Sequence, residues 1–135
     1  MGINRSSRLI LSCREVKNVE LRECYERMGA DYEEVLKRLL VPGHIRRVLC
    51  MFPEDANYAA LENAFTKKDS EAAERAVHSL KGICMNLGLS RLLASTCALA
   101  DALKAGMPFE AAESLLLSVR SDYQTAVRAI RSLSE

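Results

Sequence analysis

The stretch that decides the fold is residues 109–133, FEAAESLLLSVRSDYQTAVRAIRSL. Its apolar side chains recur at alternating spacings of three and four residues, which places them on one face of a helix. That face consists of Phe109, Ala112, Leu116, Val119, Tyr123, Ala126, Ile130 and Leu133. A stripe of this length is typical of a helix packed lengthwise in a bundle.

The same helical period runs through the rest of the chain, and no segment shows the alternation of a strand. Breaks between the periodic segments fall at glycines, at prolines and at polar residues that favour helix ends. The expected helices cover about residues 19–28, 31–40, 45–52, 58–65, 69–87, 90–105 and 108–133. We therefore predict an all-α fold: an antiparallel four-helix bundle with an additional short N-terminal helix.

Length and composition indicate a single globular domain. The chain has 135 residues, of which 49% are hydrophobic and 27% charged, so it carries enough apolar material for a core. Its net charge of only +1 argues against nucleic acid as the main partner, because phosphate binding needs a basic excess. We expect a flexible basic leader over residues 1–17 and the bundle over residues 18–135.

The sequence gives no sign of a membrane or of an oxidising compartment. No apolar run approaches the length of a membrane-spanning helix, and Leu9-Ile10-Leu11 is too short for the core of a signal peptide. Met1-Gly2 followed by Ser6 fits the loose myristoylation pattern, but a flexible basic leader is the better explanation. The five cysteines are odd in number and widely spaced, without a CxxC pair. We expect a cytoplasmic protein, a monomer, with neither disulfides nor a zinc site.

One helix, residues 71–87, carries more than a packing face. Projected at about 100° per residue, its apolar residues gather on one side. His78 falls on the opposite side, toward solvent. The residues that share its face include Glu74, Arg75, Lys81, Gly82 and Met85.

Gly82 is out of place in this helix, because a mid-helix glycine costs about 1 kcal/mol relative to alanine. It lies one turn beyond His78, where a bare stretch of helix would let a partner bring a reactive group close. Imidazole is a good nucleophile near neutral pH, and Lys81 could offset the charge of an incoming phosphoryl group. A solvated histidine on a charged face would give the same spacing, so both interpretations stay open at this point.

The string His78-Ser79-Leu80-Lys81-Gly82, followed by Asn86-Leu87-Gly88, resembles the signature of histidine phosphotransfer (HPt) domains. The resemblance extends over about residues 20–133. It implies that His78 accepts a phosphoryl group, that Lys81 assists with the phosphate, and that Gly82 gives the partner room. Glu74, Arg75 and Met85, which share the face of His78, are expected to contact the partner. The sequence departs from the family pattern at Ile83-Cys84-Met85 and at the Pro42-Gly43 break.

The resemblance further implies a phosphocarrier in a two-component phosphorelay, which exchanges the group with receiver-domain aspartates. The partner would be a response-regulator receiver, a hybrid sensor histidine kinase, or both. The alternative is a helical adaptor that docks on a receiver or kinase domain without carrying phosphate.

Other kinds of site find little support in the sequence. No Gly-rich phosphate loop or nucleotide motif is present, so we expect no kinase activity of its own and no cofactor. His44 begins a helix after Pro42-Gly43. The chain has only two histidines, so a metal site would also need carboxylates, which the sequence does not place, and we expect no metal site.

Overall fold

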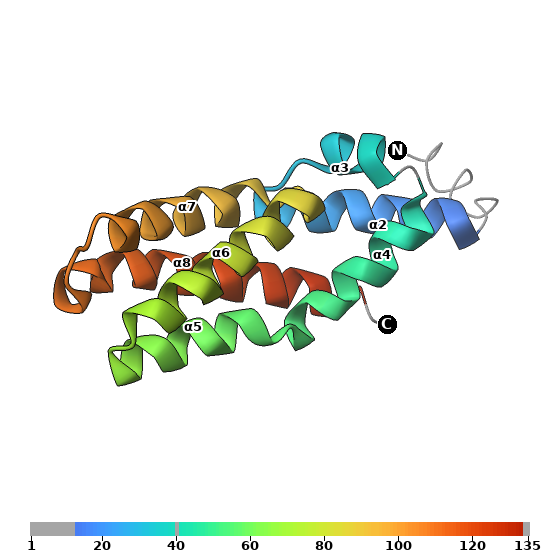
Figure 1. The fold of residues 1–135 in the computed structure, drawn as a ribbon. Helices are drawn as coiled ribbons and strands as arrows, with labels where there is room; N and C mark the ends of the chain where they lie inside the picture. The colour runs from blue at the N-terminus through green and yellow to red at the C-terminus, as the bar shows by residue number, and fades with distance from the viewer. Residues whose placement is uncertain (1–12, 40, 134–135) are drawn as a thin grey trace.

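The computed structural model describes residues 13–39 and 41–133, and every regular element in these ranges is helical (Figure 1). The prediction of an all-α fold is therefore confirmed. In chain order the elements are α2 (Cys13–Met28), α3 (Tyr32–Leu39), α4 (Pro42–Met51), a short 3-10 helix η1 (Phe52–Glu54), α5 (Ala56–Lys67), α6 (Ser70–Leu87), α7 (Ser90–Lys104) and α8 (Phe109–Arg131).

The core of the fold is an antiparallel packing of consecutive helices from α5 to α8 (Figure 1). The apolar stripe of residues 109–133 faces this core as predicted. Six of its members are buried and the two aromatic ones, Phe109 and Tyr123, are half-buried. The buried members are Ala112, Leu116, Val119, Ala126, Ile130 and Leu133.

Local signals at the chain turns fix where α6 begins and ends. The Asp69 side chain accepts a hydrogen bond from the backbone N–H of Ala72 at 3.1 Å, which satisfies one of the orphan donors at the helix start. Gly88 adopts a left-handed conformation (φ 69°) at the other end, which suits a residue without a Cβ. Residues at the two ends of α6 thus determine where the helix begins and where the chain turns into α7.

The N-terminal part of the described chain consists of three helices, where the sequence predicts helical segments over about residues 19–28, 31–40 and 45–52. Gly29 (φ 65°) and Pro42 divide it into α2, α3 and α4, because each ends or begins a helix. α2 begins at Cys13 rather than near Val19, so the helix includes residues 13–17, which the sequence analysis assigns to the leader. The myristoylation string and the remainder of the leader, residues 1–12, lie outside the described residues.

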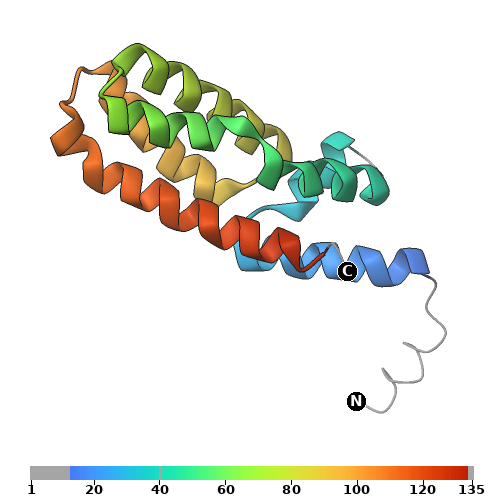
Figure 2. The same cartoon turned by 90° about the horizontal axis from the view of Figure 1, so that it is seen from below.

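Helix α2 packs against the C-terminal half of α8 (Figure 2). The Tyr25 hydroxyl donates to the carbonyl of Leu87 at 2.8 Å, and the Asp31 N–H donates to the carbonyl of Gly88 at 2.9 Å. These contacts tie the N-terminal helices to the end of α6. Among the residues described, no helix combines the length and the apolar character needed to cross a membrane.

Candidate functional site

Helix α6 presents one face to the core and one to solvent. The predicted core face is buried apart from Ile83, which is half-buried. Its fully packed members are Ala73, Ala76, Val77, Leu80, Cys84 and Leu87. The predicted division of the helix into two faces is therefore confirmed, and it holds His78 away from the core.

The predicted site residues lie together on the outer face of α6. His78, Glu74 and Arg75 are exposed, and Lys81 is half-buried. Met85 is 49% exposed, which is high for so large an apolar side chain. The single helix thus supplies a continuous surface around His78, on which an approaching group would find both charge and apolar area.

Gly82 lies in this surface without a packing reason. A Cβ added there would meet no atom within 4 Å beyond its chain neighbours and its own helix backbone. Alanine would fit, and it would favour the helix by up to about 1 kcal/mol. The space above Gly82 is open to whatever binds the helix.

His78 also lines an open groove between α6 and α7, with a volume of about 380 Å³. Its walls come from both helices: Glu74, Arg75, Val77, His78 and Lys81 on α6, and Ala100, Asp101 and Lys104 on α7. Gly82 and Met85 are not part of this lining; they continue the exposed face toward the end of α6.

The groove carries charges of both signs. Arg75, Lys81 and Lys104 supply three cations, and Glu74 and Asp101 supply two carboxylates. Within the described part of the chain, none of the five takes part in an ion pair or a side-chain hydrogen bond. A groove of this kind has cations available for an anion that arrives beside the imidazole.

The α7 wall is the part of the site that sequence reasoning missed. Asp101 and Lys104 are spaced one turn apart on α7, so they share a face. The short connection after α6 also makes α7 its antiparallel neighbour. Combining these two signals would have placed both residues opposite His78.

The buried cysteines and the second histidine of the described residues do not add to this site. Burial raises the pKa of the Cys84 thiol to about 12 and that of Cys24 to about 11, so neither is a thiolate near neutral pH. His44 is exposed on α4 and does not line the groove. In the ranges that the structure describes, no three His, Cys, Asp or Glu side chains gather in a way that could hold a metal ion.

Comparison with known proteins identifies the family of the chain. The family model of the Hpt domain matches residues 54–131, more than half of the chain, and this range holds α5 to α8 and the whole groove. Searches among curated proteins and among solved structures found no match. Hpt domains take part in histidine phosphotransfer within phosphorelays, as phosphocarriers that interact with receiver domains or hybrid kinases. The chain belongs to the Hpt domain family.

Proposed function

We propose that this protein carries a phosphoryl group on His78 and exchanges it with the aspartate of a receiver domain. The observation that carries the proposal is the position of His78. It is exposed on the outer face of α6, beside three cations without ion pairs in the described structure, within the part of the chain that the Hpt family matches.

The central step uses a neutral imidazole that a receiver's aspartyl phosphate can approach. One ring nitrogen attacks the phosphorus of the receiver's aspartyl phosphate with its lone pair, and the other ring nitrogen keeps its proton. The bond from phosphorus to the aspartate oxygen breaks, and its electron pair stays on the released carboxylate. Transfer back to a receiver reverses these steps.

Lys81 and Gly82 have separate roles in this proposal. Lys81 extends from the turn after His78 and neutralises charge on the phosphoryl oxygens during transfer. Gly82 keeps the helix surface bare, so that the loops around the receiver's aspartate can come within reacting distance of the imidazole. Glu74, Arg75 and Met85 extend the contact surface on the same helix.

The test is phosphotransfer from a panel of ³²P-labelled receiver domains. A matching receiver should label the wild-type protein and His44→Gln, but not His78→Gln, and the label should be acid-labile. Acid-labile label on His78→Gln would show that the acceptor lies elsewhere. Binding of a phosphorylated receiver without any transfer would instead favour the adaptor function.

A further inference from the structure

The α7 wall of the groove has no role in the proposed transfer step. Two of its three residues, Asp101 and Lys104, are charged, and the third, Ala100, is small. A role for this wall rests on the proposed function, because it concerns the phosphoryl group once that group is attached to His78.

The antiparallel register brings Lys104 and His78 toward each other. Counted from the hairpin turn at Gly88 and Leu89, Ala100 is about level with His78, and Lys104 lies about one helical turn further from the turn. Side chains lean toward the N-terminus of their own helix. Because α6 and α7 run in opposite directions, the side chains of His78 and Lys104 lean into the same part of the groove.

Ala100 leaves that part of the groove open. Its side chain is a single methyl group at the level of His78, so a group attached to the imidazole has space between the helices. The small residue on α7 therefore accommodates the modified histidine, and the larger charged residues flank it.

The charge of Lys104 is not neutralised by an ion pair within the described ranges. Arg120 and Lys68, in contrast, are held by carboxylates: Arg120 by Glu62 at 2.8 Å and Lys68 by Glu110 at 2.9 Å. Lys104 forms no such pair within the described ranges, although Asp101 lies one turn before it on α7. A phosphoryl group carries close to two negative charges near neutral pH and would attract Lys104 and repel Asp101.

We propose that Lys104 binds the phosphoryl group on His78 from across the groove, and that Asp101 opposes it. The two residues of α7 then set how much phosphohistidine is present at equilibrium with a phosphorylated receiver. Lys81 acts during transfer, whereas Lys104 acts on the product.

The first experiment measures the equilibrium constant for transfer between His78 and a receiver domain that labels the wild-type protein. Lys104→Ala should shift the constant toward the receiver by about two- to five-fold, the effect of one partly solvated charge. Asp101→Asn should shift it by a similar factor toward His78, and Lys104→Arg should stay near wild type. Lys67→Ala is the matched control, since Lys67 is an exposed lysine in the last turn of α5, outside the groove.

The second experiment needs no receiver. Phosphoramidate transfers its phosphoryl group to histidine: its phosphorus–nitrogen bond breaks, ammonia leaves, and a bond from phosphorus to the imidazole forms. The ³¹P chemical shift of the loaded protein, followed against pH, gives the pKa of the phosphohistidine. Lys104→Ala should raise that pKa, because a nearby cation disfavours the protonated form, and Asp101→Asn should lower it. His78→Gln identifies the signal by its loss.

These outcomes separate the two proposals. If no receiver labels wild-type His78 while phosphoramidate does, the proposed function fails, and the ³¹P titration still decides the role of Lys104. If Lys104→Ala changes neither the equilibrium constant nor the pKa of the phosphohistidine, the inference is wrong. It is equally wrong if the variant only weakens receiver binding, since Lys104 would then be a docking contact.

Discussion

The His78 side chain has few direct contacts for a residue with a proposed chemical role. No side chain of the described structure holds the imidazole by a hydrogen bond or an ion pair. Charged side chains line the groove beside the imidazole, and the rest of its surroundings is open to solvent. The neighbours should therefore alter how fast the phosphoryl group moves more than they alter the fold.

For Lys81 we expect a large effect on the transfer rate and none on the fold. Lys81→Ala should slow transfer from a phosphorylated receiver by at most about 10²–10³-fold, the effect of losing one group that stabilises transition-state charge. Rapid-quench kinetics with saturating receiver would measure it, and the far-UV circular dichroism spectrum should be unchanged. An unaltered rate would make Lys81 an ordinary solvated surface residue.

At the scale of the element, helix α6 could be predicted from its own residues and their immediate neighbours in the sequence. The Asp69 cap, the buried face and the left-handed Gly88 all depend on residues within α6 or next to it, so the sequence alone could predict them. The exposure of His78 follows from the same periodicity.

Two features could not be predicted in this way. The start of α2 at Cys13 lacks a periodic apolar signal, because residues 13–20 are mostly charged or polar. The α7 wall of the groove depends on how two helices align, and this alignment is a property of the packed pair. Asp101 and Lys104 taken alone are two charged residues on an amphipathic helix.

A substitution at Gly82 tests whether α6 is less stable as a helix in return for leaving the receiver a path to His78. Gly82→Gln should melt no lower than wild type, because the site is open and glutamine favours a helix over glycine. It should nevertheless lose most receiver binding and transfer, since the side chain fills the approach to His78. Thermal unfolding and transfer rates would be measured on the same samples.

The control for this variant is Ser118→Gln, at an exposed position on α8. It introduces the same side chain on another helix and should leave transfer unchanged. A destabilised but fully active Gly82→Gln would mean that the glycine serves close packing and that this face of α6 does not bind the partner.

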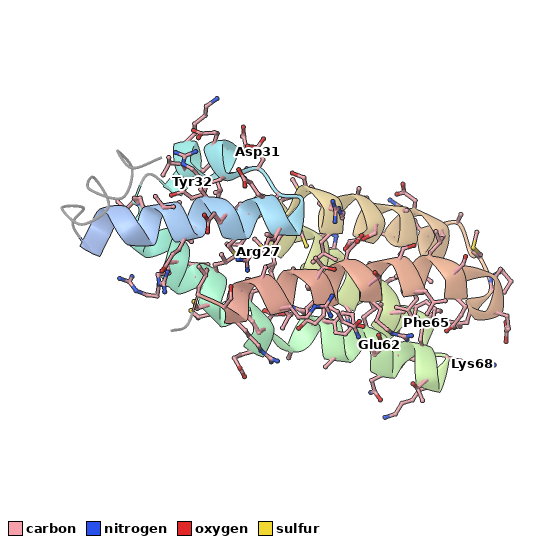
Figure 3. All side chains as sticks on the ribbon, turned by 180° about the vertical axis from the view of Figure 1, so that it is seen from behind. Arg27, Asp31, Tyr32, Glu62, Phe65 and Lys68 are labelled. Atoms are coloured by element: carbon pink, nitrogen blue, oxygen red, sulfur yellow. The ribbon has the colours of Figure 1, made fainter. Side chains whose placement is uncertain are left out.

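At the scale of the whole molecule, hydrogen bonds between polar side chains join α5 to α8. The α5 member is Glu62, which Figure 3 labels. Arg120 donates two hydrogen bonds to the Glu62 carboxylate, both at 2.8 Å, and the Tyr58 hydroxyl donates to the same carboxylate. The Tyr58 ring stacks on Tyr123, with 3.9 Å between ring centroids. These hydrogen bonds, from Arg120 first, lower the pKa of Glu62 below its ordinary value of 4.5.

The stability of the bundle should therefore depend on Glu62 in a defined pH range. Because its pKa is lower in the folded state, its contribution is full above about pH 4.5 and disappears as the pH falls through the folded-state value. Glu62→Gln should lower the free energy of unfolding by about 0.5–1 kcal/mol at pH 7, since the pair is partly solvated. The difference should shrink toward pH 3, as measured by urea unfolding.

Glu110→Gln is the comparison, because it removes an ion pair whose partners are both exposed. Its effect at pH 7 should be smaller than that of Glu62→Gln. A difference between wild type and Glu62→Gln that persists at pH 3 would show that the carboxylate charge is not the source of the stabilisation.

Two turns that are distant in the sequence are joined through their backbones. The Asp31 N–H bonds to the carbonyl of Gly88, and the Arg91 N–H bonds to the carbonyl of Gly29 at 3.2 Å. Turn amides ordinarily exchange their hydrogens with solvent quickly, because small local openings suffice. Here both turns must separate first, so in D₂O these two amides should keep their protons about as long as the mid-helix amides of α6. Exchange at the rate of an exposed turn would show that the N-terminal helices detach from the bundle by themselves.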